Sequence, residues 1–406
     1  MSYDHAAIVL NMDANGLGVA RGLGRLGVDV SGVDTSPDAL GLRSRYCRRW
    51  FLMPDPVRQP EAAVTGLLAL AERYEVKPVL IPTADFYVRL LSDHADRLAE
   101  RFLFNVPDRD VVHQIVDKRQ QYAAAERAQI AVPRRYSANS PGEIETIRSK
   151  LQFPVFVKGA DSHRWSVAFG CKGFRANDLD ELRAHLALAR SRGLDTVVQE
   201  IIPGPNRNHY KVCAYFSRDR ELLALFSTAK RRQYPVDFGV GTCMVSERRD
   251  DLIDLALRFF RSLNYCGVGS IEFKIDERDG SCRMLELNPR LWLQNIQATL
   301  AGVNFPEIYY RDVIGERPRP VLSFDEGAIW INLKKDLLSF AVNRRQGETG
   351  IGEWLRSVLF ADSFAWFAWD DPRPGVATGG WKKLLALPAS VPRVLRRSLK
   401  QASTPA

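Results

Sequence analysis

Charged side chains stand inside or at the ends of apolar segments between residues 117 and 290 of this 406-residue chain. Lys158 ends the apolar run 153–158, so we expect its ammonium group to face a cleft and to need an anion. Glu272 and Glu286 lie within apolar, strand-like segments, where an unpaired carboxylate is costly. A cation held near both carboxylates relieves that cost. The residue types therefore indicate a site that binds an anion and a cation together.

These residues belong to an ordered series. It runs through Asp117-Lys118 in an expected helix, the strands 153–159, 198–204 and 271–274, and the segment 285–290 after a turn. Glu286 and Asn288 alternate along one strand and so share a face, which Glu272 on the neighbouring strand also reaches. Two carboxylates and an amide oxygen are hard ligands that suit Mg²⁺. The alternative is a solvated strand face that carries acids by chance.

In this order and on these elements, the motifs resemble those of the ATP-grasp superfamily, and most closely its carboxylate–amine ligases. The resemblance extends from about residue 5 to about residue 315. It implies that ATP lies between two antiparallel sheets. It also implies an ATP-dependent, Mg²⁺-dependent ligase that forms an amide or peptide-like bond through an acylphosphate, with Mn²⁺ as a substitute metal.

The resemblance also assigns roles to matching positions. ATP is expected to contact Lys118, Lys158, Lys172 and the hinge residues Gln199, Glu200, Ile201 and Ile202. The metal is expected at Glu272, Glu286 and Asn288, and the catalytic cations are Arg290, Arg232 and Lys230. Lys172 lies in an expected mobile loop over the phosphates, residues 161–173. The stretch 204–209 lacks the acid that holds ribose in many relatives, so Asn206 and Asn208 remain alternatives.

The hydrophobic pattern predicts an α/β fold followed by an α+β fold. Strands at 6–10, 28–33 and 78–82 alternate with helices, which implies parallel pairing. Two antiparallel hairpins are expected later, at 210–227 and 267–287, after a helix at 112–128. With the resemblance, we expect a Rossmann-like pre-ATP-grasp domain at 1–110, an ATP-grasp domain of two antiparallel-sheet lobes at 111–320 and a small C-terminal extension at 321–406.

Two other classes of function stay open. Gly16 and Gly18 follow the first strand, with Asp34 further on, as in NAD(P)- or FAD-dependent oxidoreductases, but Arg21 stands where the fingerprint has a third glycine. A catalytically idle, membrane-associated ATP-binding protein is the second alternative. It rests on residues 381–406, which carry six basic residues and no acid. Within the fold, a kinase or a carboxylase is also compatible with the motifs.

The charge and the hydrophobic pattern limit the kinds of partner and the location that we expect. The net charge is +9, of which +6 lies in residues 381–406, so the remaining chain is nearly balanced and no nucleic-acid partner is expected. The chain shows neither a long apolar run nor the basic-then-apolar order of a secretory signal, so we expect a cytoplasmic protein, with 381–406 as a candidate peripheral contact at the inner face of the membrane. The expected partners are small-molecule carboxylate and amine substrates, and a second copy of the chain, because the family commonly pairs.

Overall fold

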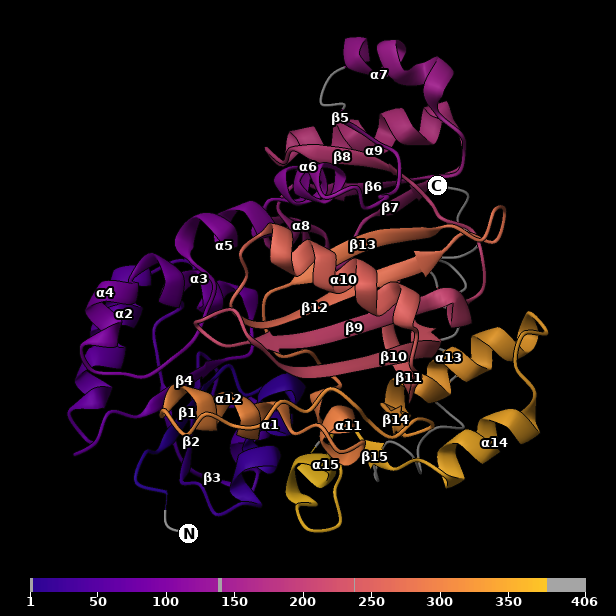
Figure 1. Ribbon diagram of the computed structural model, residues 1–406. Helices are drawn as coiled ribbons and strands as arrows, with labels where there is room; N and C mark the ends of the chain where they lie inside the picture. Colours follow the sequence, from indigo (N-terminus) through magenta and orange to yellow (C-terminus); the bar gives the residue numbers. More distant parts are fainter. Residues whose placement is uncertain (1–2, 138–140, 237, 378–406) are drawn as a thin grey trace.

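The computed structural model describes residues 3–137, 141–236 and 238–377, and its strands form three sheets (Figure 1). The first sheet is parallel and has the order β3-β2-β1-β4. Its strands are β1 (Ala7–Leu10), β2 (Val30–Asp34), β3 (Cys47–Leu52) and β4 (Val79–Pro82). The helices of this region are α1 (Ala14–Gly24), α2 (Pro60–Ala71), α3 (Asp85–Asp93) and α4 (Ala95–Ala99). The predicted parallel strands near the N-terminus are thus confirmed.

The second sheet is the largest, with the order β13-β12-β9-β10-β11-β14-β15. Its strands are β9 (His209–Phe216), β10 (Leu222–Tyr234), β11 (Val240–Ser246), β12 (Gly267–Ile275), β13 (Cys282–Asn288), β14 (Ile329–Ile331) and β15 (Ser363–Phe364). Both predicted hairpins are present as the antiparallel pairs β9–β10 and β12–β13. Helix α10 (Asp250–Ser262) lies across one face of this sheet (Figure 1).

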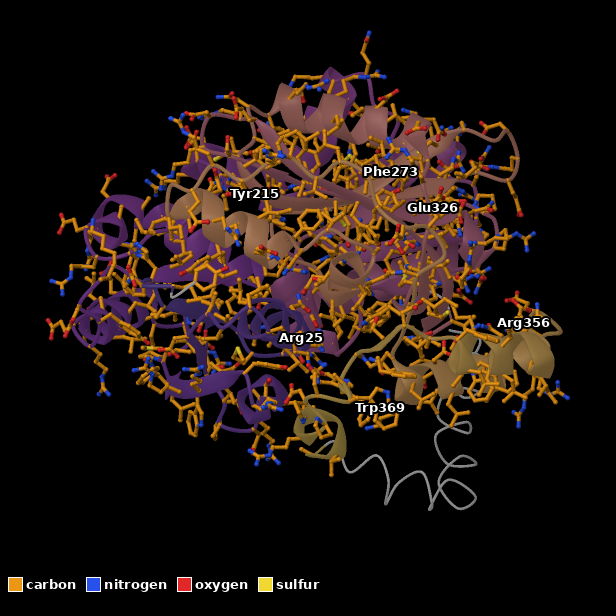
Figure 2. All side chains as sticks on the ribbon, turned by 60° about the horizontal axis from the view of Figure 1, so that its bottom comes forward. Arg25, Tyr215, Phe273, Glu326, Arg356 and Trp369 are labelled. Atoms are coloured by element: carbon orange, nitrogen blue, oxygen red, sulfur yellow. The ribbon has the colours of Figure 1, made fainter. Side chains whose placement is uncertain are left out.

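Alternation along the strands decides which side chains reach the other face. On β9, Tyr210, Val212, Ala214 and Phe216 pack in the hydrophobic core that α10 closes. His209 and Lys211 therefore point to the opposite face. Tyr215 and Phe273, both labelled in Figure 2, are fully buried. Tyr215 belongs to the core on one side of the sheet and Phe273 to the core on the other.

The third sheet is small and antiparallel, with the order β5-β8-β6-β7. Its strands are β5 (Arg135–Ser137), β6 (Val155–Gly159), β7 (Phe174–Ala176) and β8 (Thr196–Glu200). Its helices are α7 (Pro141–Ile147), α8 (Ser162–Phe169) and α9 (Leu179–Ser191). The helices α5 (Arg109–Val116) and α6 (Lys118–Arg127) precede it. The coarse prediction of a mixed α/β fold with several sheets is confirmed, whereas the domain boundaries stay a prediction.

The C-terminal part of the described chain packs against the N-terminal region. Helices α11 (Asn295–Leu300), α12 (Phe305–Val313), α13 (Leu333–Arg345), α14 (Ile351–Leu359) and α15 (Arg373–Ala377) belong to it. Arg21 on α1, only 1% exposed, donates to the Asp371 carboxylate (3.0 Å) and to the Trp366 carbonyl (2.8 Å). This buried ion pair fastens the segment after β15 to the N-terminal sheet.

Two local predictions are wrong. The expected helix at 112–128 is two helices, because Asp117 caps α6 by accepting the amides of Arg119 and Gln120. The expected loop at 161–173 contains the helix α8.

No helix in the described part of the chain combines the length and apolar character needed to cross a membrane. The basic tail 381–406 lies outside the described residues.

Candidate active site

A cleft of about 1820 Å³ lies where the three sheets meet. Its walls include Asn15 and Asp85 from the N-terminal part, Lys158 from the small sheet, and Lys211 and Glu286 from the large sheet. This volume exceeds the ~300–1,000 Å³ of a usual small-molecule pocket. The cleft therefore has room for a nucleotide together with a second substrate.

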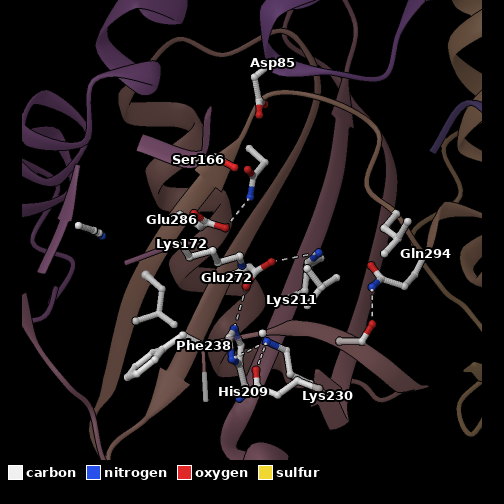
Figure 3. Close-up of a pocket in the computed structure, with 18 of the residues that line it drawn as sticks. Asp85, Ser166, Lys172, His209, Lys211, Lys230, Phe238, Glu272, Glu286 and Gln294 are labelled. Carbon is white, nitrogen blue, oxygen red and sulfur yellow. Dashed lines mark hydrogen bonds and ion pairs between the residues drawn. The ribbon is translucent and has the colours of Figure 1, made fainter. Parts of the chain in front are cut away.

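Two carboxylates stand side by side on one wall. Glu272 on β12 and Glu286 on β13 are directly paired in the antiparallel register, so their side chains share the cleft face. Asn288 lies two residues beyond Glu286, and its amide nitrogen donates to Glu286 Oε1 (3.2 Å). All three predicted metal ligands are thus brought together at one corner of the cleft, where Figure 3 labels Glu272 and Glu286.

Cationic side chains keep both carboxylates ionised. Lys211 Nζ lies 3.1 Å from Glu272 Oε1, and Lys118 Nζ lies 3.3 Å from Glu286 Oε2. His209 Nε2 is 2.9 Å from Glu272 Oε2 (Figure 3). Burial opposes ionisation of both acids, but the neighbouring lysines prevail. They hold the pKa of Glu286 at about 2 and the pKa of Glu272 well below its usual range.

The donor set of this corner fits Mg²⁺. Its oxygens come from two ionised carboxylates and one amide, and each carboxylate oxygen has a second lone pair beside its present partner. Within the described ranges, no group of three or more His, Cys, Asp or Glu side chains is placed to hold a metal. Mg²⁺ commonly takes one or two carboxylates and completes its shell with water and substrate phosphates. The corner therefore suits a cation that arrives with a phosphate ligand.

Besides Lys211, the lysines that line the cleft include Lys118, Lys158, Lys172 and Lys230. Lys158 Nζ donates to the Tyr122 hydroxyl (2.9 Å) and lies 5.0 Å from the centre of that ring. Burial and the neighbouring Lys118 lower the pKa of Lys158 to about 7. Burial also lowers the pKa of Lys230 to about 7, and Lys172 opposes its charge as well. Such crowded, desolvated ammonium groups indicate a site built to receive a polyanion.

The segment predicted to hold adenine borders the cleft at the end of β8. Gln199, Glu200, Ile201 and Ile202 all line it. The ladder of β8 with β6 ends at the pair Glu200–Val155. Ile201 and Ile202 follow directly after this last pair and lie outside the strand, at the edge of the cleft.

The acids and amides near this segment have distinct environments. Glu200 accepts a hydrogen bond from Arg278 (2.6 Å), so its side chain is engaged. Asn208 donates to the Ile275 carbonyl (3.3 Å), whereas Asn206 lines the cleft. Of the two alternatives for a ribose contact, the geometry favours Asn206.

The predicted catalytic cations separate into two groups. Arg290 lines the cleft and donates to Asp85 (3.0 Å), and Lys230 lines it and donates to Gln233 Oε1 (3.1 Å). Arg232 is not among the cleft-lining residues. It is 3% exposed and forms two hydrogen bonds to the Asp336 carboxylate, at 2.9 and 2.8 Å.

A break in strand register explains the position of Arg232. Residues two apart on a regular strand share a face, so an unbroken β10 would place Lys230 and Arg232 on the same side. The β10–β11 pairing shifts between Lys230 and Arg232 and again between Arg232 and Gln233. These irregularities turn Arg232 towards α13 and leave Lys230 and Gln233 at the cleft. The prediction that Arg232 contacts substrate is wrong on this geometry.

The first glycine motif has a structural use. Gly16 and Gly18 lie inside α1, and a Cβ on Gly18 would come within 2.3 Å of Asn295 Oδ1. The Asp34 carboxylate accepts the amides of Met12 (2.7 Å) and Ser36 (3.0 Å), so it holds its own loop. These contacts do not favour a dinucleotide site.

Sequence reasoning missed part of the site. The sequence pattern assigned no role to Lys211, Gln233 or His209, which all line the cleft. Lys211 could have been found, because it alternates with apolar residues on the strand His209–Phe216. Tyr122 and Asp85 gave no such signal, since their roles depend on how distant segments pack.

Comparisons with known proteins agree with this geometry. Residues 117–304 match the family model described as the carbamoyl-phosphate synthase L chain, ATP binding domain. The chain is 23% identical to the D-aspartate ligase of Enterococcus faecium (strain Aus0004) over 354 residues, which covers 82% of this chain and 84% of the relative.

Solved structures show the same fold at low identity. N5-carboxyaminoimidazole synthetase from Staphylococcus aureus, complexed with ADP, superposes with a TM-score of 0.65 at 14% identity, over 85% of this chain and 87% of that one. L-amino acid ligase from Bacillus licheniformis gives a TM-score of 0.61 at 13% identity, over 79% and 76%.

Proposed function

The chain belongs to the ATP-grasp superfamily, and from that premise we propose that it is a ligase that joins a small-molecule carboxylate to an amine with conversion of ATP to ADP and phosphate. One observation supports this most directly. Glu272 and Glu286 are paired in register at one corner of a large cleft, and lysines surround the same corner. Opposite charges held at such short range suit a metal–phosphate ligand.

The finer architecture is part of the proposal. Residues 1–110 would form the pre-ATP-grasp domain, and 111–320 the ATP-grasp domain, with the small sheet and the large sheet as its two lobes. The region 321–406 would be an extension. The nucleotide would then lie between the two antiparallel sheets, and the N-terminal sheet would close the cleft on the side of Asp85 and Arg290.

Each group in the cleft has a task in this reading. Adenine would pair with the backbone at 199–202, and Lys118, Lys158 and Lys172 would offset the phosphate charges. Glu272, Glu286 and Asn288 would hold Mg²⁺, which supplies further neutralisation of the phosphate charge when bound. Mn²⁺ has the same ligand preferences and could replace it.

The chemistry then needs no protein nucleophile. A carboxylate oxygen of the substrate attacks the γ-phosphorus of ATP, the bond to the bridging oxygen breaks, and ADP leaves. The acylphosphate is next attacked at its acyl carbon by a neutral amine, phosphate leaves, and the amine loses a proton. Arg290 and Lys230 line the cleft beside this corner and would stabilise the negative charge that develops on oxygen. Positioning and electrostatics carry the catalysis.

The test is a screen for ADP release. Purified protein is incubated with ATP, Mg²⁺ and pairs drawn from amino acids, other small carboxylates and small amines. Products of active pairs are identified by mass spectrometry. We expect ADP release that requires both partners and a product whose mass equals the two substrates less one water. If active pairs release ADP but none of them gives a condensed product, the proposal is contradicted.

A further inference from the structure

One part of the cleft takes no part in the binding of nucleotide and metal proposed above. It lies between β11, the turn before α11 and the C-terminal segment 329–366. We call it the C-terminal subsite, and its cleft-lining residues are Met244, Leu293, Gln294, Lys334, Lys335 and Trp366.

Hydrogen bonds and apolar contacts place these segments together. The Asn332 amide donates to the Thr242 carbonyl (2.8 Å), which fixes the start of α13 beside β11. Gln294 Nε2 lies 3.5 Å from the neighbouring Gly241 carbonyl (Figure 3). Leu293 and Trp366 pack on the apolar cluster that contains Met244.

The strongest indication of a ligand is the amide of Gln294. This side chain is 2% exposed and lines the cleft. Its Oε1 has no hydrogen-bond partner among the residues that the structure describes. A buried amide oxygen without a donor is unfavourable, and native proteins rarely tolerate one. An N–H group of a ligand in the cleft would satisfy it.

Unpaired cations stand at the same subsite. Lys334 and Lys335 are exposed in the first turn of the 13-residue helix α13 and line the cleft. Across the described ranges neither lysine forms an ion pair, and the adjacent Asp336 is fully buried against Arg232. The amino end of a helix adds positive potential. Together they favour an anion such as a carboxylate.

The segment that carries Trp366 is anchored by hydrogen bonds. The Trp366 carbonyl accepts a hydrogen bond from Arg21 (2.8 Å), and Arg21 is fixed in turn by Asp371 (3.0 Å). The indole therefore lines the cleft from a segment that is anchored to α1.

The subsite also adjoins the proposed reaction centre. Gly241 pairs with Gln233 in the β10–β11 register, and Gln233 Oε1 accepts a hydrogen bond from Lys230 (3.1 Å). Lys230 Nζ lies 3.0 Å from His209 Nδ1, and His209 contacts Glu272. A short chain of contacts therefore joins Gln294 to the carboxylate corner.

We propose that the C-terminal subsite binds an amino-acid substrate and sets the selectivity of the enzyme for it. An N–H group of the amino acid donates to Gln294 Oε1, a carboxylate faces Lys334 and Lys335, and the carbon chain packs on Trp366 and Met244. The inference rests on the proposed ligase function. It adds which class of molecule is one substrate and which residues select it.

The test separates amino-acid binding from nucleotide binding. ADP release is measured with ATP, Mg²⁺, a set of small amines and carboxylates, and a panel of the twenty standard amino acids with D-alanine, D-aspartate and D-glutamate. The KM of the most active amino acid is then compared in Gln294→Leu, Lys335→Gln and Trp366→Ala, and the Kd of Mg-ADP is measured by calorimetry. The matched controls are Gln120→Leu and Lys150→Gln, which are exposed and do not line the cleft.

We expect Gln294→Leu to raise the KM for the amino acid by about tenfold or more, because one buried hydrogen bond to a charged group is lost. Lys335→Gln raises it less, Trp366→Ala changes the order of preference among amino acids, and the Kd of Mg-ADP stays within about twofold in all three. The conservative change Gln294→Asn keeps an amide and retains part of the affinity.

Three results would overturn the inference. One is an amino-acid KM in Gln294→Leu equal to that of the controls. Another is an equal loss of Mg-ADP affinity, which would indicate a general structural defect. The third is ADP release stimulated only by compounds that are not amino acids, which refutes the subsite assignment while the ligase function stands. If no pair of compounds stimulates ADP release, the proposed function itself fails.

Discussion

Glu272 and Glu286 face each other across the β12–β13 ladder, and each carboxylate is bound by a different lysine. Two like charges at opposing strand positions repel each other unless cations compensate them. Lys211 and Lys118 provide that compensation in the structure. A metal ion bound to nucleotide phosphates would find both oxygen donors already ionised.

The first prediction concerns the carboxylate at the centre of this corner. Glu286→Gln keeps the shape of the side chain but removes its charge. We expect ATP turnover to fall by at least about 100-fold, because an interaction with the metal–phosphate group is lost in the transition state. The free energy of unfolding should change little, since Asn288 can still hydrogen-bond the amide. ADP release and thermal unfolding are the measurements, with the exposed Glu100→Gln as control. Full turnover in the variant would refute the metal assignment.

A second prediction follows from the corrected position of Arg232. Its guanidinium is paired with Asp336, which also accepts hydrogen bonds from Thr242 and Trp354. Arg232→Met leaves a buried carboxylate without its charge partner, so the free energy of unfolding should fall by about 3–5 kcal/mol. Urea unfolding measures the loss.

The Mg-ADP affinity separates a structural role of Arg232 from a catalytic one. In the folded variant it should equal that of the wild type, because Arg232 does not line the cleft. A variant of normal stability with weakened nucleotide binding would show instead that Arg232 belongs to the site.

A third prediction is a proton taken up when nucleotide binds. The pKa of Lys158 is lowered to about 7 from its ordinary value of 10.5, so this lysine is mostly neutral in the free protein near pH 8. Adjacent phosphates favour its charged form and raise its pKa. Binding of Mg-ADP should therefore take up protons near pH 8 and fewer near pH 6, where the lysine is already charged.

Calorimetry in buffers of different ionisation enthalpy measures this proton uptake. Lys158→Met should reduce the uptake near pH 8, whereas the exposed Lys150→Met should not. Proton release, or an uptake that is equal at both pH values, would contradict the assignment of Lys158 to the phosphates.

A fourth prediction tests the interface between α1 and α11. A Cβ on Gly18 would meet Asn295 Oδ1 at 2.3 Å, and Asn295 in turn donates to the Asn15 carbonyl (2.9 Å). Gly18→Ala should therefore lower the free energy of unfolding by about 1–3 kcal/mol through overcrowding. It should disturb the affinity for the amine or carboxylate substrate more than the Mg-ADP affinity, because Asn15 lines the cleft. The reverse pattern in calorimetry would count against the roles given to the N-terminal sheet.

Much of the site could be predicted because it depends on regular periodicity. The positions of Glu272, Glu286 and Asn288 follow from alternation along two neighbouring strands, and Lys158 follows from its place at the end of an apolar strand. Such features depend on residues that are close in sequence, so the packing of distant segments does not change them. Their order along the chain is what carries the family resemblance, and the resemblance in turn implies their roles.

The remaining features depend on events that a single sequence does not display. The register breaks beside Arg232 depend on how β10 meets β11, so the alternation failed there. The cap at Asp117 divided one apparent helix into two. The contribution of the C-terminal segment could not be predicted either, because Trp366 reaches the cleft through its contact with Arg21, which is 345 residues away in sequence.

The central claim is that a substrate carboxylate is activated by phosphoryl transfer from ATP, and an isotope measurement tests it most directly. The carboxylate substrate found in the screen is labelled with oxygen-18 in its carboxyl group and turned over with ATP, Mg²⁺ and the amine. Mass spectrometry of the released phosphate should show one oxygen-18 atom from each labelled carboxylate. Phosphate that contains no label, formed along with the amide product, would contradict an acylphosphate and with it the proposed mechanism.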